Sequence, residues 1–203
     1  MSMTIFYPIG DCLYINITNR CTCRCTFCIR SKADRVHRSD VLWLEREPTV
    51  AEILAAARAY DFGHYRELVF CGFGEPTERL DDLLQITSIW KQAAPELVVR
   101  INTNGLCDLS HGQNTAQRMA GLIDKVSVSM NASNPEDYLA LTRSKFGIGS
   151  YRAMLQFAAN CQRCGIDVQY TIVDVLPADQ VRECQRISAE MGIPLKIRPY
   201  AES

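Results

Sequence analysis

The chain has 203 residues, of which 47% are hydrophobic, and this length and composition predict a globular protein of one large domain or two small ones. Because no internal linker stands out, we expect a single domain spanning residues 1–203. Its 22 basic and 23 acidic residues nearly balance, which argues against an extended nucleic-acid-binding surface. No apolar run approaches the roughly 20 residues that span a bilayer, and the first residues lack the pattern of a secretory signal. We therefore expect a cytoplasmic protein with no membrane association.

Six strand-like segments alternate with segments of helical periodicity. The predicted strands cover residues 13–18, 67–71, 97–102, 125–130, 168–173 and 194–199. Between the first two strands, Thr49 and Glu52 form a capping-box pattern at the start of an apolar stripe. Two later apolar stripes end at Gly165 and Gly192, which are typical helix C-terminal residues. This alternation predicts parallel strands joined by right-handed helical crossovers.

Six such units in 203 residues are too few for the eight units of a closed barrel. The predicted fold is therefore α/β, an open, partial (β/α)6 barrel of parallel strands that resembles part of a TIM barrel. Binding and catalytic residues of such folds gather at the carboxyl ends of the strands. The segments that directly follow each predicted strand are thus the candidates for a functional site.

Four of the ten cysteines lie within eight residues, just after the first predicted strand. The spacing Cys21-x3-Cys25-x2-Cys28, with Phe27 directly before the last cysteine, places three thiols on one short loop. Three thiolates can bind three irons of a [4Fe-4S] cluster and leave the fourth iron open. Cys23 is then an additional cysteine within the loop.

A zinc site formed by all four cysteines is the alternative. Structural zinc normally draws its ligands from two separated pairs. Such a second pair is not near in the sequence, because Cys161 and Cys164 follow more than a hundred residues later. Their positions beside a predicted apolar stripe favour buried, inert thiols.

Two further strand ends carry polar or glycine-rich sequences. The second strand is followed by residues 72–76, GFGEP, in which Gly74 lets the backbone approach a ligand and Glu75 adds an acid. A turn alone would also favour glycine and proline here. The third strand ends with Asn102, and Asn104 begins an Asn-Gly turn. We favour Asn102 as a residue that contacts a bound molecule, and Asn104 as a residue that only shapes the turn.

The fourth predicted strand has apolar residues on one face and polar residues on the other. Val126 and Val128 lie on one side, whereas Ser127, Ser129 and Asn131 lie on the other. We expect a parallel strand between helices to be buried on both faces. Buried hydroxyl and amide groups need partners, so the polar face indicates a polar ligand inside the barrel.

The cysteine spacing with its aromatic residue resembles the cluster motif of the radical S-adenosylmethionine (SAM) superfamily, and the other strand ends agree with it over nearly the whole chain. The resemblance implies that Cys21, Cys25 and Cys28 hold one [4Fe-4S] cluster. The contacts to SAM or its cluster that it implies are Phe27, Gly74, Glu75, Asn102, Ser129 and Asn131.

A narrower resemblance is to the TatD family-associated radical SAM proteins. It rests on the sequences NITNRC, CTFCIR, FCGFGEPT, RINTNGL, VSVSMNA and IRPY. It implies a functional link to a TatD-type metal-dependent hydrolase. Phe73, where a second glycine is usual in the superfamily, and the additional Cys23 depart from the commonest pattern.

The superfamily resemblance implies an enzyme that reductively cleaves SAM to a 5′-deoxyadenosyl radical, which abstracts hydrogen from a substrate. A small molecule or nucleotide is the favoured substrate, and a flavodoxin or ferredoxin-type protein is the implied electron donor. Two alternatives stay open. One is an activase that installs a glycyl radical in a partner protein, and the other is a non-catalytic zinc or iron-sulfur binding module.

A basic stretch follows the cysteines. Its members are Arg30, Lys32, Arg35, His37 and Arg38. A solvated loop is the favoured interpretation. The alternative is an anion-binding lid over SAM or a phosphorylated substrate.

Overall fold

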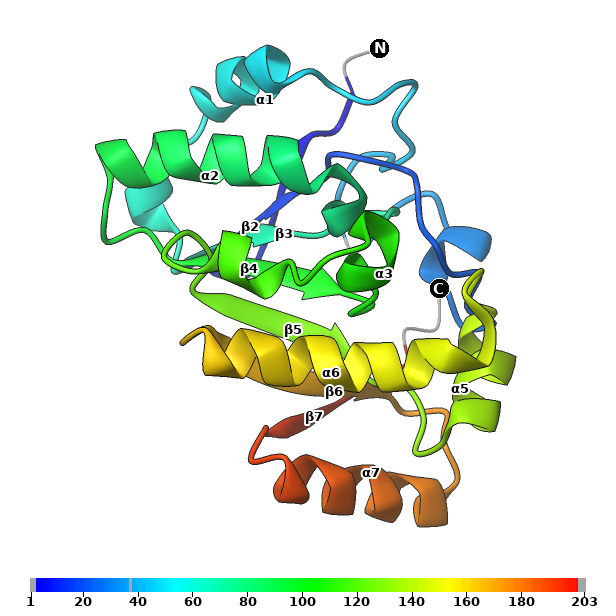
Figure 1. The fold of residues 1–203 in the computed structure, drawn as a ribbon. Helices are drawn as coiled ribbons and strands as arrows, with labels where there is room; N and C mark the ends of the chain where they lie inside the picture. The colour runs from blue at the N-terminus through cyan, green and yellow to red at the C-terminus, as the bar shows by residue number, and fades with distance from the viewer. Residues whose placement is uncertain (1–2, 37, 201–203) are drawn as a thin grey trace.

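The computed structural model describes residues 3–36 and 38–200, so His37 of the basic stretch lies outside the described residues. Within them, seven strands form one sheet in sequential order (Figure 1). The strands are β1 (Phe6–Ile9), β2 (Cys12–Ile15), β3 (Glu67–Phe70), β4 (Val99–Thr103), β5 (Lys125–Ser129), β6 (Asp167–Val173) and β7 (Leu195–Arg198). β1 pairs antiparallel with β2, and all later neighbours are parallel.

Helices connect the parallel strands. They are α1 (Val50–Ala57), α2 (Leu80–Ala93), α3 (Cys107–His111), α4 (Ala116–Met119), α5 (Pro135–Thr142), α6 (Ser150–Arg163) and α7 (Ala178–Glu190). Short 3-10 helices are η1 (Ile29–Ser31), η2 (Phe62–His64), η3 (Pro76–Arg79) and η4 (Gly147–Gly149). The predicted capping box at Thr49 and Glu52 is present at the start of α1. Gly165 and Gly192 follow α6 and α7 with positive φ, as their predicted role as helix ends requires.

The predicted open α/β sheet with six parallel strands is confirmed. Strand β1 is an addition that the sequence reading missed. It forms a hairpin with β2 through Gly10, whose φ of 57° suits a tight turn. The hairpin shows little signal because each of its strands is only four residues long.

One face of the sheet carries the hydrophobic core. Figure 1 shows α2, α6 and α7 along the outside of the curved sheet, against this face. The buried apolar strand residues are Leu13, Ile15, Leu68, Phe70, Val99, Ile101, Val126, Val128, Val168, Tyr170 and Ile172. Their burial with the helices' apolar stripes is the main favourable contribution to folding.

The other face of the sheet carries a small apolar cluster of Tyr7, Leu42 and Phe73 at its β1 end, and polar side chains that line a hollow farther along. Paired residues of a parallel sheet share a face, and the register pairs Ser127 with Asn102 and with Gln169. The next row pairs Ser129 with Thr171. The expected burial of the fourth predicted strand on both faces holds at its centre, since Ser127 on the polar face is 8% exposed, whereas Ser129 is partly exposed. Its polar residues face the hollow because the helices pack on one side only.

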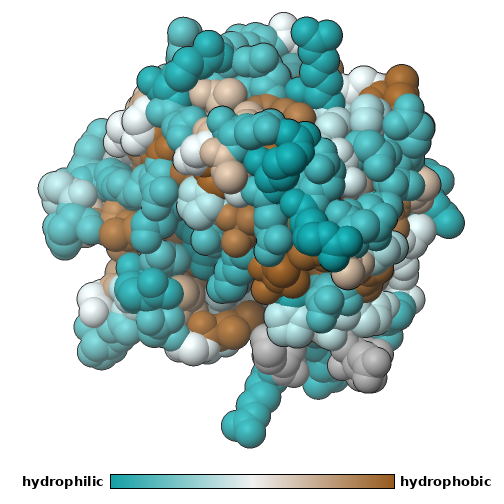
Figure 2. Space-filling view, turned by 90° about the horizontal axis from the view of Figure 1, so that it is seen from below, coloured by the Kyte–Doolittle hydropathy of each residue, from teal (hydrophilic) through white to brown (hydrophobic). Residues whose placement is uncertain are grey.

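The surface of the protein is mostly hydrophilic, with hydrophobic residues in small patches on the face seen in Figure 2. The large apolar side chains exposed among the described residues are Val41, Trp43, Ile89, Leu109, Ile148, Val175 and Ile197. Across residues 3–36 and 38–200, none of the helices has the length and apolar character needed to cross a membrane.

Candidate active site

The cysteine loop follows β2 at the carboxyl end of the strands and is held by distant elements. The backbone N–H groups of Arg24 and Thr26 donate to the carbonyls of Thr142 and Leu141, each at 2.9 Å. Both acceptors lie in the last turn of α5. The loop is therefore fixed against an element that is more than a hundred residues later in the chain.

Arg30 stabilises the cysteine loop through hydrogen bonds to three backbone carbonyl groups. Its Nη1 donates to the carbonyl oxygens of Asn19 at 3.2 Å and Phe73 at 3.1 Å, and its Nη2 donates to that of Cys23 at 3.3 Å. These bonds join both ends of the cysteine loop to the segment after β3. Neither interpretation of the basic stretch describes Arg30, which serves as a structural tether.

The four thiols differ in exposure. Cys23 is 2% exposed and belongs to the hydrophobic core, whereas Cys21, Cys25 and Cys28 are partly exposed. Phe27 is half-buried in the turn that the N–H of Cys28 closes by donating to the carbonyl of Cys25 at 3.2 Å. The three predicted ligands are thus the accessible cysteines, and the additional one packs inward.

Two of these thiols are held in the protonated form. The neighbouring Cys23 thiol, together with burial, raises the pKa of Cys21 far above its usual range. Contact with Cys21 lowers the pKa of Cys23, but the Cys25 thiol and burial raise it, with a net value of about 12. Metal binding must therefore displace protons. No three His, Cys, Asp or Glu side chains in the described part of the chain are grouped to hold a single metal ion.

The segment after β3 packs tightly on the segment after β2. A Cβ atom on Gly74 would lie 2.3 Å from the carbonyl oxygen of Thr18 and 2.6 Å from that of Arg20. The N–H of Glu75 donates to the same Arg20 carbonyl at 2.7 Å. The glycine is required because no side chain fits between the two backbones.

The Glu75 carboxylate connects the segments after β3 and β4. Its Oε1 accepts from the N–H and hydroxyl of Thr77 at 3.2 and 2.8 Å and from the Thr103 hydroxyl at 2.8 Å. Its Oε2 accepts from the Asn104 N–H at 2.7 Å. Burial raises its pKa, although these hydrogen bonds oppose the shift. Protein donors thus bond to both oxygens of this carboxylate, and the predicted contact of Glu75 with SAM stays a prediction.

Asn102 and Asn104 both hydrogen-bond within the protein, and the predicted contact of Asn102 with SAM stays a prediction. Asn102 faces the hollow, where its Oδ1 accepts from Arg100 Nη1 at 2.7 Å and its side chain contacts the Cys71 thiol. It is therefore engaged in a polar network below the rim.

Asn104 reaches the cysteine loop as well as shaping its own turn. Its Nδ2 donates to the Thr22 hydroxyl at 3.0 Å and lies 3.7 Å from Cys23 Sγ and 4.0 Å from Cys21 Sγ. Sequence reasoning missed this role. The available signal was its position two residues after Asn102, on the same face and nearer the rim.

Ser129 and Asn131 lie at the carboxyl end of β5. Asn131 is 5% exposed and adopts a left-handed backbone with φ of 58°, which asparagine tolerates. Its buried Oδ1 has no hydrogen-bond partner among the described residues. An unpaired buried amide oxygen is costly, so a ligand with a donor group would stabilise this site.

These residues fit a [4Fe-4S] cluster and SAM. Three accessible thiols on one loop match the ligand set that leaves one iron open. The buried, unpartnered Asn131 oxygen supplies an acceptor at the same rim. The close approach at Gly74 brings the backbones after β2 and β3 together there.

Comparison with known proteins gives sequence relatives. The chain matches the family model of the Radical SAM superfamily over residues 15–186. GTP 3',8-cyclase of Corynebacterium glutamicum is 32% identical over 149 residues, which cover 68% of this chain and 35% of that protein. Probable GTP 3',8-cyclase of Methanothermobacter thermautotrophicus is 32% identical over 143 residues, covering 66% and 39%. The chain thus spans little more than a third of the length of these curated relatives.

Solved structures share the fold. Native anSMEcpe with bound AdoMet has a TM-score of 0.66 at 15% identity, over 93% of this chain and 51% of that one. A radical SAM methyltransferase from Sphaerobacter thermophilus has a TM-score of 0.53 at 18% identity, over 96% and 68%. Because the family match covers most of the sequence, the chain belongs to the radical SAM superfamily of enzymes that use a [4Fe-4S] cluster and SAM.

Proposed function

We propose that this enzyme cleaves SAM at a cluster held by Cys21, Cys25 and Cys28 and removes hydrogen from a nucleotide or similar small molecule. The observation that carries the proposal is the meeting of the cysteine loop with the ends of β3 and β4 and with α5. Three accessible thiols and an unsatisfied amide oxygen lie at that rim.

The chain's own residues hold and orient the cofactors. When bound, the cluster and SAM supply one-electron cleavage of a C–S bond and a 5′-deoxyadenosyl radical that abstracts hydrogen. Cys21, Cys25 and Cys28 provide the thiolate ligands. Ser129 and Asn131, at the carboxyl end of β5, would contact SAM. Arg30 and Glu75 keep the surrounding loops in place through the hydrogen bonds described above.

A nucleotide substrate is supported by the relatives and by the hollow. The relatives are named GTP 3',8-cyclase, although this chain spans only 35–39% of their length. The hollow is lined by hydroxyl, amide and charged groups, which suit a polar substrate. The narrower resemblance to TatD family-associated proteins stays a prediction, as do the TatD-type hydrolase partner, the cytoplasmic location and the single domain.

Enzymes of this family need an electron donor, and a flavodoxin or ferredoxin-type protein is our proposal for it. Neither alternative function is favoured. A non-catalytic module leaves the buried, unpartnered Asn131 oxygen without a ligand. A glycyl-radical activase lacks a supporting feature in the sequence after Cys28.

The test uses ribose-deuterated GTP and ATP with the protein reconstituted anaerobically with iron and sulfide. SAM and dithionite are added, and the 5′-deoxyadenosine is analysed by mass spectrometry. We expect deuterium in the 5′-deoxyadenosine with at least one nucleotide, and no product from Cys25→Ala. Product that carries no deuterium from either nucleotide would contradict a nucleotide substrate.

A further inference from the structure

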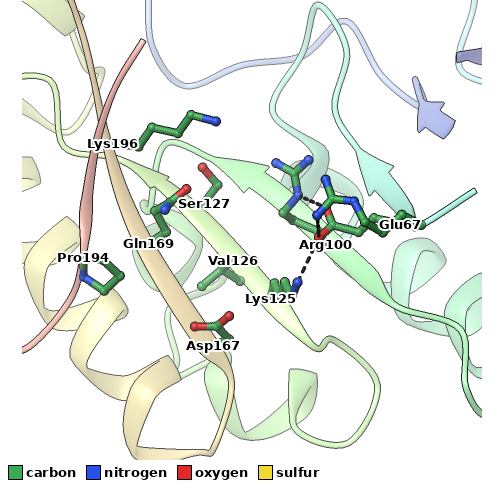
Figure 3. Close-up of a pocket in the computed structure, with 10 residues that line it drawn as sticks. Glu67, Arg100, Lys125, Val126, Ser127, Asp167, Gln169, Pro194 and Lys196 are labelled. Atoms are coloured by element: carbon green, nitrogen blue, oxygen red, sulfur yellow. Dashed lines mark hydrogen bonds and ion pairs between the residues drawn. The ribbon is translucent and has the colours of Figure 1, made fainter. Parts of the chain in front are cut away.

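The hollow contains a second polar site at the opposite end of the strands from the cysteine loop. A pocket of about 290 Å³ lies there, and Figure 3 shows its lining. Residues that line it include Glu67, Arg100, Lys125, Ser127, Gln169 and Lys196. Glu67 and Lys125 are the first residues of β3 and β5, and Arg100 is the second residue of β4.

The pocket has an excess of positive charge. Its lining holds four cationic side chains, the others being Arg66 and Lys196, against two carboxylates, Glu67 and Asp167. Arg66 also pairs with Asp11 at 2.7 Å outside the pocket. Lys196 forms no ion pair among the described residues. A cleft with this imbalance attracts anions.

The Glu67 carboxylate is already paired with two cations of the pocket lining. Glu67 is 5% exposed at its side chain and accepts from Arg100 Nε at 2.8 Å and from Lys125 Nζ at 2.9 Å, as the dashed lines of Figure 3 indicate. Two cations on one buried carboxylate leave a net positive charge at this wall. Glu67 therefore positions the two cations and does not cancel them both.

Arg100 has N–H donors that are not used by its two side-chain hydrogen bonds. A guanidinium has five N–H donors, and Arg100 gives one to Glu67 and one to the Asn102 Oδ1 at 2.7 Å. Its side chain is 21% exposed, so it is partly shielded from water. A planar, partly desolvated guanidinium matches the geometry of phosphate oxygens.

Neutral donors complete the pocket. Ser127 and Gln169 are paired in the sheet register and lie between the cations (Figure 3). Neither side chain has a hydrogen-bond partner in residues 3–36 and 38–200. Their hydroxyl and amide groups are thus free to bind a ligand's oxygen atoms.

We propose that this pocket binds the phosphate end of the substrate, an inference that rests on the proposed function. Its volume is at the lower limit of small-molecule sites, which suits one or two phosphate groups rather than a whole nucleotide. Lys125 and Ser129 are four residues apart on β5, about 13 Å along the strand. A phosphate beside Lys125 leaves the rest of the substrate directed toward the cysteine rim.

The test measures binding of inorganic pyrophosphate to the reconstituted protein by calorimetry, without SAM or reductant. We expect Lys125→Gln to weaken binding about tenfold, as loss of one charged contact predicts. Ser127→Ala, which leaves the charge network intact, is expected to weaken it about threefold through loss of one neutral hydrogen bond. Arg152→Gln removes an exposed cation of α6 outside the pocket lining and should leave the affinity unchanged.

A competition with GTP identifies the source of the phosphate. Displacement of pyrophosphate by GTP, but not by guanosine, supports binding of a nucleotide's phosphate end. Pyrophosphate binding that GTP does not displace overturns the substrate assignment. Wild-type protein that binds no pyrophosphate, or binding unaffected by both pocket substitutions, overturns the site itself.

The outcome is separable from that of the proposed function. SAM cleavage without pyrophosphate binding overturns only the pocket. Pyrophosphate binding that is sensitive to Lys125→Gln, in a protein that makes no 5′-deoxyadenosine, overturns the proposed function and leaves an anion site.

Discussion

Single side chains hold the loops of the candidate site together. Arg30 binds three carbonyl groups, and Glu75 accepts four hydrogen bonds across two segments. Asn104 joins the end of β4 to the cysteine loop. Each side chain spans residues that are distant in sequence, so each fixes the geometry that cofactor binding needs.

Replacing Arg30 tests its role as a tether. Arg30→Gln cannot reach all three carbonyls, so we expect the free energy of unfolding to fall by about 1–3 kcal/mol and less iron to be retained after reconstitution. Urea denaturation and iron analysis measure the two effects. Arg24→Gln removes an exposed charge from the same loop and serves as the control. Equal losses of stability and iron in Arg30→Gln and Arg24→Gln would show that the positive charge matters, and not the hydrogen bonds of Arg30.

Glu75 gives a pH-dependent prediction. Burial raises its pKa above the ordinary value of 4.5, so the folded protein keeps this proton to higher pH than the unfolded chain. Its stabilising contribution is full below that ordinary value and declines as the pH rises toward the folded pKa. The difference in unfolding free energy between wild type and Glu75→Gln should therefore fall across this range in urea titrations. If the difference in unfolding free energy instead grows with pH, Glu75 does not have a raised pKa in the folded protein.

The sequence predicts the candidate cluster ligands, but it does not predict the residues that support their loop. Cys21, Cys25 and Cys28 follow from spacing along a continuous segment. Arg30 and Asn104 act through contacts with segments far along the chain, which spacing does not reveal. Arg30 therefore looked like part of a solvated basic stretch.

Among the elements, the contact between the segments after β2 and β3 is the tightest at the site. Gly74→Ala would force a methyl group against the carbonyls of Thr18 and Arg20. We expect a loss of about 1–3 kcal/mol in unfolding free energy, from overpacking, and impaired cluster incorporation. Thermal and urea unfolding with iron analysis measure both.

A matched glycine gives the control for this substitution. Gly149 has a φ of −66° and no atom within 4 Å of an added Cβ. Gly149→Ala should therefore leave stability and iron content close to wild type. If Gly74→Ala behaves like Gly149→Ala, the two segments are not tightly packed in solution.

The elements themselves were largely predictable, because strand and helix patterns are local. The six parallel strands and the ends of α1, α6 and α7 appear where their patterns and caps indicate. Strand β1 was missed because four residues carry too little alternation. The burial of Ser127 follows from the pattern of its strand, but its pairing with Asn102 and Gln169 depends on the sheet register, which no single strand encodes.

The whole molecule is an open sheet with apolar helix packing on one face, and with a small apolar cluster and a polar hollow on the other. The strands' carboxyl ends carry the cysteine loop, and their amino ends carry the cationic pocket. The first location follows from the topology of parallel strands. The second could not be predicted, because Glu67, Arg100 and Lys125 come from three separate strands and only the sheet register brings them together.

The assay of 5′-deoxyadenosine in wild type, Cys25→Ala and Cys23→Ala tests the central claim most directly. All three proteins are reconstituted anaerobically and supplied with SAM and dithionite. We predict product from the wild type and from Cys23→Ala, since Cys23 packs in the core, and none from Cys25→Ala. Product from Cys25→Ala, or its loss in a folded Cys23→Ala protein, would contradict the assignment of Cys21, Cys25 and Cys28 as the ligands.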